Sequence, residues 1–362
     1  MTLPSARTRR RPMEASDAPP SGRPFVSIVV PCRNEAEYIG PLLDSILAND
    51  YPHDRLEVLV VDGMSDDGTR EVVAPYAERH PSIRLLDNPR RITPCALNLG
   101  ISQAGGAIIF RMDAHDRYPM NYIGDLVAWL ERTGADHVGG VRVTLPADGT
   151  AVARAIALAL AHPFAVGSPG YRRGTPEPRE EGTAPLGCYR REVFARVGLF
   201  DEELVRNQDA EFDFRLRKAG QRMLVVPGVV SYYHGRRSLL QLARMYYQYG
   251  YFHPLVARKA GRITTRRQLV PPLFVTGLIT TGLLAPWFAA ARVAWALVLG
   301  AYATATVACS TVVLLRHGVR VGLVIPAAFA VVHVSYGLGF LRGVWDFLVL
   351  RRPAPVSVPL SR

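Results

Sequence analysis

Residues 108–119 read Ile108-Ile109-Phe110-Arg111-Met112-Asp113-Ala114-His115-Asp116-Arg117-Tyr118-Pro119. The apolar start of this stretch, which follows Gly105 and Gly106, predicts a buried strand that ends in acidic and imidazole side chains. Ligands of open α/β sheets bind at the carboxyl ends of strands. Asp113 and His115 are two residues apart, so in an extended chain they project to the same side. They are candidates for half of a divalent-cation site, although a strand followed by a polar turn explains the same residues.

The chain around this stretch alternates between predicted strands and helices. Strands are expected over residues 25–31, 56–61, 83–86 and 107–112, and helices over residues 39–47, 71–79 and 94–103. This alternation implies an α/β fold with a parallel sheet and helices on its faces. Later helices are expected over residues 122–133, 151–161, 207–220 and 238–245, the last with Ser238 as its cap. Later strands are expected over residues 136–143 and 223–227, and residues 229–234 continue the second of these or pair with it.

Three of the predicted strands deliver polar residues at their carboxyl ends. The pairs are Asn34 with Glu35, Asp62 with Ser65, and Asp113 with His115. Three such ends on one sheet edge define a cleft. Residues 62–69 read DGMSDDGT, which lacks both the GxGxxG spacing of a dinucleotide site and the GK[ST] of a phosphate-binding loop. An NAD-dependent oxidoreductase is therefore disfavoured, whereas Asp62 could accept hydrogen bonds from a ribose or base, or serve as a turn residue.

Two later segments carry candidate functional residues. Asp209 lies at the start of a predicted helix, where it is either an acid that complements the helix dipole or a general base for a hydroxyl group; Glu211 is the weaker candidate for that role. Gln241 and Arg244 are three apart and share a helix face, which could equally be a solvated one. Residues 167–184 have no periodicity, and a loop of this length is typical of a functional lid.

The composition divides the chain. The 362 residues carry a formal charge of +12, which suits nucleic acid, anionic lipid or phosphorylated substrates without choosing among them. The four cysteines make no CxxC pair, so neither a disulfide framework nor a zinc knuckle is expected. Residues 1–24 are predicted to be a disordered basic arm. Residues 25–255 have the composition of a soluble domain, residues 256–268 form a basic juxtamembrane segment, residues 269–350 are apolar, and residues 351–362 are a tail.

The apolar region contains three uncharged runs, over residues 269–291, 293–315 and 321–341. Each is long enough to cross about 30 Å of hydrocarbon, which predicts a multi-pass membrane region of about three spans. Arginines before the first run and between the second and third predict that these loops, and the domain over residues 25–255, lie in the cytoplasm. Three spans would leave Arg342, Arg351 and Arg352 outside, against that rule. Residues 343–350 are therefore an interfacial helix or the third run is re-entrant.

The ordered motifs resemble those of family 2 glycosyltransferases, which have the GT-A fold, a Rossmann-like nucleotide-diphospho-sugar transferase domain. The chain is most similar to membrane-attached members of the succinoglycan (exopolysaccharide) type, over about residues 25–255. The motifs that carry this resemblance are Val29 to Glu35, Val61 to Thr69, Asp113-Ala114-His115, Gly187 to Arg191, and Gln208-Asp209.

The resemblance implies a role for each of these residues. Binding of the nucleotide-sugar donor is expected of Pro31, Arg33, Glu35, Asp62, Ser65, Asp113 and Gly187. Asp113, His115 and His234 would ligate Mn²⁺ or Mg²⁺, where His115 stands in place of the last Asp of the DxD motif and Asp116 is an alternative ligand. Asp209 would be the catalytic base, with Gln208 in place of the Glu of the ED motif. Gln241 and Arg244 resemble a QxxRW motif that contacts the acceptor or diphosphate, with Met245 in place of Trp.

The resemblance also implies an activity. The expected reaction is an inverting, metal-dependent transfer from a UDP-sugar to a lipid-linked glycan acceptor at the cytoplasmic face of the cell membrane, with no nucleic-acid partner. The three departures, at His115, Gln208 and Met245, leave a second reading open. In that reading the chain is a non-catalytic membrane component that binds a nucleotide-sugar within a glycan assembly or export complex.

Overall fold

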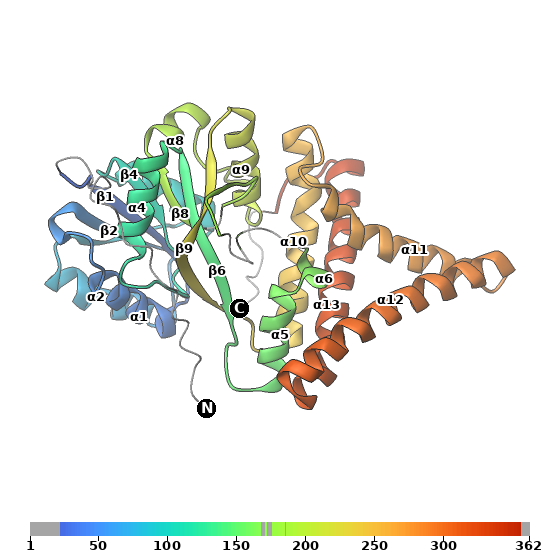
Figure 1. Cartoon of the computed structure of the whole chain (residues 1–362). Helices are drawn as coiled ribbons and strands as arrows, with labels where there is room; N and C mark the ends of the chain where they lie inside the picture. Colours follow the sequence, from blue (N-terminus) through green and yellow to red (C-terminus); the bar gives the residue numbers. More distant parts are fainter. Residues whose placement is uncertain (1–21, 168–170, 172–175, 185, 356–362) are drawn as a thin grey trace.

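The computed structural model describes residues 22–167, 171, 176–184 and 186–355 (Figure 1). The predicted basic arm therefore lies almost wholly outside the described residues, as does the end of the tail, and the predicted lid lies outside them at residues 168–170 and 172–175. The strands are β1 (Val26–Cys32), β2 (Leu56–Asp62), β3 (Ile83–Asp87), β4 (Ile108–Arg111), β5 (Asp116–Arg117), β6 (His137–Leu145), β7 (Arg179–Glu180), β8 (Gly187–Arg190) and β9 (Met223–His234).

Within the described residues the strands form one mixed sheet in the order β3-β2-β1-β4-β8-β6-β9-β5, with β7 paired to β9. The strands β3, β2, β1 and β4 are mutually parallel, which confirms the predicted parallel sheet for the first half of the domain. Strand β8 runs antiparallel to both β4 and β6. Strand β9 continues without a break through the two predicted segments and pairs in parallel with β6.

Helices cover both faces of this sheet (Figure 1). From residue 22 to residue 260 the helices are α1 (Ala36–Leu47), α2 (Thr69–Arg79), α3 (Thr93–Gln103), α4 (Tyr122–Thr133), α5 (Ala151–Ala161), α6 (Pro163–Val166), α8 (Glu192–Val197), α9 (Gln208–Lys218) and α10 (Leu239–Ala260), with a 3₁₀ turn η2 (His53–Arg55) before β2. Ser238 caps α10 as predicted, because its hydroxyl accepts a hydrogen bond from the backbone N–H of Gln241.

The strand residues alternate between two cores. In β1, Ile28 and Val30 pack on the side of α1 and α4, whereas Val29 packs on the side of α3 and α9. In β2, Val60 packs in the first of these cores and Val61 packs in the second. Because both faces of the parallel strands are covered, their sequences are continuous apolar runs. The four cysteines, all within the described residues, form no disulfide.

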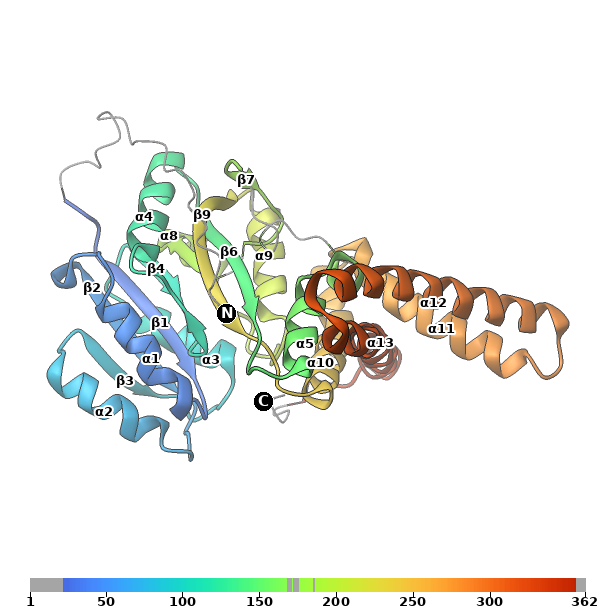
Figure 2. The ribbon, with the colours of Figure 1, turned by 60° about the horizontal axis from the view of Figure 1, so that its bottom comes forward.

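The C-terminal region consists of η3 (Arg266–Leu269), α11 (Val270–Leu284), α12 (Ala289–His317), α13 (Val319–Gly343) and a π-helical turn η4 (Val344–Val349). Figures 1 and 2 show α11 and α12 as a hairpin that projects away from the sheet, while α13 lies along α10. By length and composition, two helices of the described residues could cross a membrane, α12 and α13 with η4. The first predicted span forms α11, whose 15 residues extend about 22 Å and fall short of the bilayer core.

Candidate active site

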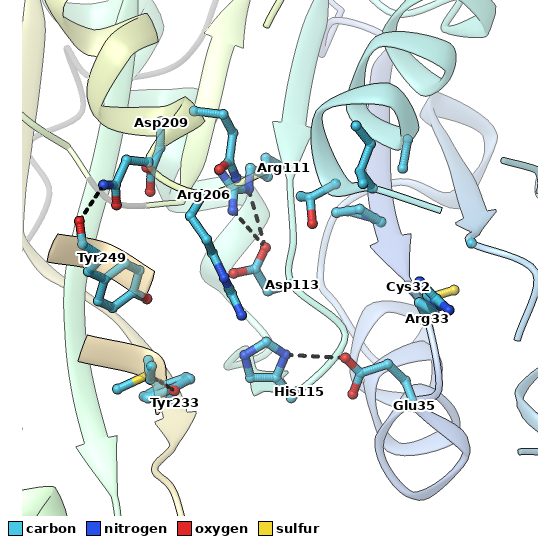
Figure 3. A pocket seen from close by; sticks show the side chains of 18 of the residues that line it. Cys32, Arg33, Glu35, Arg111, Asp113, His115, Arg206, Asp209, Tyr233 and Tyr249 are labelled. Carbon is cyan, nitrogen blue, oxygen red and sulfur yellow. Dashed lines mark hydrogen bonds and ion pairs between the residues drawn. The ribbon is translucent and has the colours of Figure 1, made fainter. Parts of the chain in front are cut away.

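A central cleft opens where the carboxyl ends of β1 and β4 face the start of α9 and one side of α10 (Figure 3). Six of the predicted site residues line it: Pro31, Arg33, Glu35, Asp113, His115 and Asp209. The strand ends meet there because β1 pairs in parallel with both β2 and β4. The cleft lies at the predicted edge of the sheet and is lined by Glu35, Asp113 and His115, whereas Asn34, Asp62 and Ser65 do not line it.

Asp113 is an ionised carboxylate fixed by two arginines. Its Oδ1 accepts hydrogen bonds of 3.2 Å from both Nε and an Nη of Arg111, and its Oδ2 lies 3.6 Å from Arg142. Its backbone N–H donates to the hydroxyl of Tyr118. Burial alone would raise the pKa of Asp113, but the cations of Arg111 and Arg142 lower it to about 2. The charge of Asp113 is therefore kept across the physiological pH range.

His115 is a neutral imidazole on the same side of the cleft. Burial lowers its pKa to about 3, and the cations of Arg142, Arg236 and Arg206 add to that effect against the attraction of Asp113. Its Nδ1 lies 3.7 Å from Oε1 of Glu35, and its ring contacts the edge of Tyr233. A neutral imidazole retains a nitrogen lone pair that can bind a metal.

Asp116 lies in a different position from Asp113 and His115, the two predicted metal ligands beside it. It pairs in β5 with β9, its side chain is fully buried, and its Oδ1 accepts a 2.8 Å hydrogen bond from Arg142. Burial raises the pKa of Asp116 to about 7, although Arg142 opposes this shift. Asp116 does not line the central cleft, so His115 is the better placed of the two candidate ligands.

Asp209 is exposed in the first turn of α9, across the cleft from Asp113 (Figure 3). Asn207 begins that helix with a left-handed backbone (φ 62°), and its side-chain amide donates to the carbonyl of Tyr249 in α10. Glu211, the weaker candidate base, is instead held by Arg215 through two hydrogen bonds of 2.7 and 2.8 Å. The structure therefore leaves Asp209 as the carboxylate of α9 that lines the cleft.

Three predicted donor-binding residues lie outside the cleft lining. Asp62 is fully buried, and its carboxylate accepts hydrogen bonds from Ser65 and from Arg70 at 2.9 Å. Ser65 in turn accepts a hydrogen bond from the backbone N–H of Asn34, so the Asp62–Ser65 pair braces the loop that presents Arg33. Gly187 is buried in β8, where a Cβ would collide with the carbonyl of Val138.

Three further predicted residues are also directed elsewhere. His234 lines a separate hollow with Tyr38, and His115 lies between this hollow and the cleft. The Oε1 of Gln241 accepts from the backbone N–H of Arg237. Arg244 is exposed on the face of α10 that looks toward α13. The α10 residues that do line the cleft are Met245, Tyr246 and Tyr249.

Sequence reasoning missed most of the cations in this cleft. The arginines that line it are Arg33, Arg91, Arg111, Arg142, Arg206 and Arg236, of which only Arg33 was predicted. Arg111 stands directly before Met112 and Asp113 in the quoted stretch, so its place at a strand end could have identified it. Arg206 and Arg236 lie in loops of the described chain and have no such signature.

The donors on one side of the cleft suit a divalent cation. Asp113 offers an ionised carboxylate and His115 a neutral nitrogen, a combination that favours Mn²⁺ over Mg²⁺. No group of three or more His, Cys, Asp or Glu side chains in the described ranges could hold a metal ion by itself. Asp113 and His115 are the side chains that could hold a cation on this side of the cleft.

Comparison with known proteins identifies the family. The model of the Glycosyl transferase family 2 domain matches residues 27–198. The succinoglycan biosynthesis protein ExoA of Rhizobium meliloti (strain 1021) is 32% identical over 325 residues, which cover 88% of this chain and 95% of that protein. This chain belongs to glycosyltransferase family 2. It is therefore a glycosyltransferase, and the predicted family is confirmed.

Two more similarities place this family 2 glycosyltransferase among its relatives. A dolichyl N-acetyl-alpha-D-glucosaminyl phosphate 3-beta-D-2,3-diacetamido-2,3-dideoxy-beta-D-glucuronosyltransferase of Methanococcus voltae is 28% identical over 244 residues, covering 65% of this chain and 74% of that enzyme. The solved structure of the mannosyltransferase PcManGT from Pyrobaculum calidifontis, in complex with GDP-Man and Mn2+, aligns with a TM-score of 0.58 at 23% identity over 90% of this chain and 89% of its own. The GT-A fold predicted from the motif order is confirmed.

All three positions at which this glycosyltransferase departs from the expected motifs line the cleft. They are His115, Gln208 and Met245. Gln208 is nearly fully buried beside Asp209, and Met245 is buried on the inner face of α10. The three departures therefore change the lining of the cleft itself and do not lie on a remote surface of the domain.

Proposed function

We propose that this glycosyltransferase transfers a sugar from a UDP-sugar to a lipid-linked glycan acceptor at the cytoplasmic face of the membrane, with inversion at the anomeric carbon. The observation that carries the proposal is the arrangement of the cleft, with Asp209 on one side and Asp113 with His115 on the other. The choice of uridine rests on the likeness of residues 29–35 and 61–69 to the family motifs.

Asp209 is the proposed base. It is exposed, and the side chain of Asn207 holds the start of its helix against α10. Its carboxylate would accept the proton of the acceptor hydroxyl as that oxygen attacks the anomeric carbon. Attack from the face opposite the leaving diphosphate inverts the anomeric centre, and no second carboxylate is required as a nucleophile.

Asp113 and His115 are the proposed metal ligands. A bound Mn²⁺ or Mg²⁺ would neutralise the charge that develops on the leaving diphosphate. The ionised Asp113 and the neutral His115 are both ready to bind a cation without first losing a proton. Arg111 and Arg142 fix the orientation of Asp113, which reduces the reorganisation required when substrate enters.

The acceptor side of the proposal rests on the relatives and on the way the cleft adjoins the apolar helices. The Methanococcus voltae relative is named for a dolichyl-phosphate-linked substrate, and the Rhizobium meliloti relative for succinoglycan synthesis. Leu160 of α5 and Tyr246 of α10 line the cleft and also pack in one apolar cluster with Phe329 of α13. A lipid-linked acceptor held at a membrane would thus reach the cleft along these helices.

Replacement of Asp209 tests the proposal. Asp209→Asn keeps the size of the side chain but removes the base, so transfer should fall at least about 100-fold while UDP binding changes little. The measurement is release of the nucleoside diphosphate (UDP or GDP) from a panel of UDP- and GDP-sugars by the full-length protein, with and without Mn²⁺, together with UDP affinity by calorimetry. Asp54→Asn, an exposed carboxylate far from the cleft, is the matched control and should behave like wild type.

The reading as a non-catalytic binding component makes the opposite prediction. The purified wild-type protein would then bind UDP but release none from any UDP-sugar, whatever the metal. Loss of UDP binding in Asp209→Asn would assign Asp209 a structural role and contradict its role as the base.

A further inference from the structure

The central cleft holds more positive charge than its own carboxylates neutralise. Six arginines line it, against the carboxylates of Glu35, Asp113 and Asp209. Arg111 forms an ion pair with Asp113, and Arg142 forms ion pairs with Asp116 and Asp113. An excess of cations over carboxylates in a cleft raises the local positive potential, which favours an anionic ligand.

Arg206 reaches the cleft from the loop before α9. Its Nε donates a 3.1 Å hydrogen bond to Oε1 of Gln248, a nearly buried residue of α10. Figure 3 shows its side chain extended across the cleft toward Asp113 and His115. Gln248 therefore orients the guanidinium of Arg206, whose terminal nitrogens face the interior of the cleft.

Arg236 reaches the cleft from the connection between β9 and α10. Its backbone position is fixed, because the N–H of the preceding Gly235 donates to the carbonyl of Leu145. The Nε of Arg236 is buried and has no hydrogen-bond partner among the described residues. The next residue, Arg237, points outward and pairs with Glu37 at 2.8 Å. Two adjacent arginines thus have opposite environments, one in the cleft and one in an exposed ion pair.

We propose that Arg206 and Arg236 together form a phosphate-binding subsite of the central cleft. The planar guanidinium presents paired N–H donors that match phosphate oxygens, which makes arginine suited to such a site. Within the proposed function, the phosphate belongs either to the diphosphate of the donor or to the lipid phosphate of the acceptor. The subsite supplies positive charge from loops on the side of the cleft opposite β1 and β4, and it adds to any cation held by Asp113 and His115.

Binding measurements on the full-length protein test this subsite. The variants are Arg236→Met and Arg206→Met, which keep apolar bulk but remove the charge, and Arg237→Met is the matched control. The probes are inorganic pyrophosphate, UDP, uridine and farnesyl phosphate, each titrated by calorimetry. If the donor diphosphate is the ligand, pyrophosphate and UDP should bind at least tenfold more weakly to the two cleft variants, whereas uridine should bind as it does to wild type.

The pattern across the probes separates the sources of the phosphate. Weakened farnesyl phosphate with unchanged UDP assigns the subsite to the acceptor, and both patterns support the proposal. If neither cleft variant differs from Arg237→Met for pyrophosphate, UDP or farnesyl phosphate, the proposal is overturned. A wild-type protein that binds pyrophosphate through Arg236 but binds no UDP would refute the proposed donor and leave the subsite standing.

A further variant guards against loss of the fold. Arg236→Lys keeps the charge but lacks the planar pair of donors, and it should preserve the thermal unfolding midpoint. We expect it to bind the sensitive probe with an affinity between those of wild type and Arg236→Met. An affinity equal to that of wild type for every probe would contradict the role assigned to the guanidinium of Arg236.

Discussion

His137 is a fully buried histidine of β6 whose ring stacks on Tyr189 with centroids 3.8 Å apart. Neither ring nitrogen has a hydrogen-bond partner within the described residues, and burial lowers the pKa of His137 from 6.5 to about 3. In the unfolded chain His137 therefore binds a proton below about pH 6.5, whereas in the folded chain it stays neutral down to about pH 3. Stability should be retained above pH 6.5 and lost as the pH falls through that window, by about 2 kcal/mol at pH 5.

His137→Phe removes this titration and keeps an aromatic ring for the stack. We expect the variant to be as stable as wild type at pH 7.5 and more stable at pH 5, measured as the shift in thermal unfolding midpoint between the two pH values. His53→Phe, which changes an exposed histidine of η2, is the control and should follow wild type. Equal acid sensitivity of wild type and His137→Phe would show that His137 does not govern the loss.

At the scale of single residues, the strand ends of β1 and β4 predicted residues that line the cleft, whereas Asp62 and Ser65 at the end of β2 do not line it. Asp113 and His115 follow a buried strand, so their place in the cleft follows from the parallel pairing of β1 and β4. Arg244 could not be placed in this way. Each step along a helix turns the side chain by about 100°, and the cleft lies on the face of Met245, one residue further. Resemblance identified the right helix but not the face that it turns toward the cleft.

The contact between α10 and α13 is a close approach of two helix backbones at three glycines. A Cβ on Gly339 would lie 2.1 Å from the carbonyl oxygen of Tyr247, and a Cβ on Gly250 would lie 2.1 Å from that of Tyr336. Gly343 makes the same kind of contact with Tyr251. Helix α10 also lines the cleft through Tyr246 and Tyr249. Its packing against α13 therefore affects the position of these cleft residues as well as the stability of the fold.

Gly339→Ala should therefore separate the two helices. We expect a loss of about 1–3 kcal/mol in stability from the overpacking, and a lower turnover because α10 shifts in the cleft. Thermal unfolding and sugar transfer measure the two effects. Gly300→Ala in α12 is the matched control, because a Cβ there meets nothing within 4 Å among the described residues. A Gly339→Ala protein as stable and active as Gly300→Ala would contradict the proposed role of this contact.

At the scale of elements, apolar composition could not tell a helix that faces lipid from one that faces protein. Only 17% of the apolar stretch of α12 is buried within the protein, against 50% of that in α13 with η4. In η4, Asp346 is buried and binds Arg342, Arg352 and the hydroxyl of Tyr251. Two of the arginines that conflicted with the predicted topology, Arg342 and Arg352, are thus part of a local ion-pair network. Their partner, Asp346, could not be identified from hydropathy.

For the whole molecule, the projecting hairpin of α11 and α12 is the surface best suited to enter a membrane (Figure 2). Its turn carries Trp287 and Phe288, whose exposed fractions are 74% and 58%. Aromatic side chains at such a position favour the bilayer interface.

We expect Trp287→Glu with Phe288→Glu to reduce the fraction of protein that co-sediments with anionic vesicles, without loss of UDP binding. Met120→Glu is the control, since Met120 is equally exposed (62%) but lies on the catalytic domain. If the double variant sediments with vesicles as fully as Met120→Glu does, membrane attachment depends on another surface, and the packed α10–α13 pair becomes the next surface to mutate.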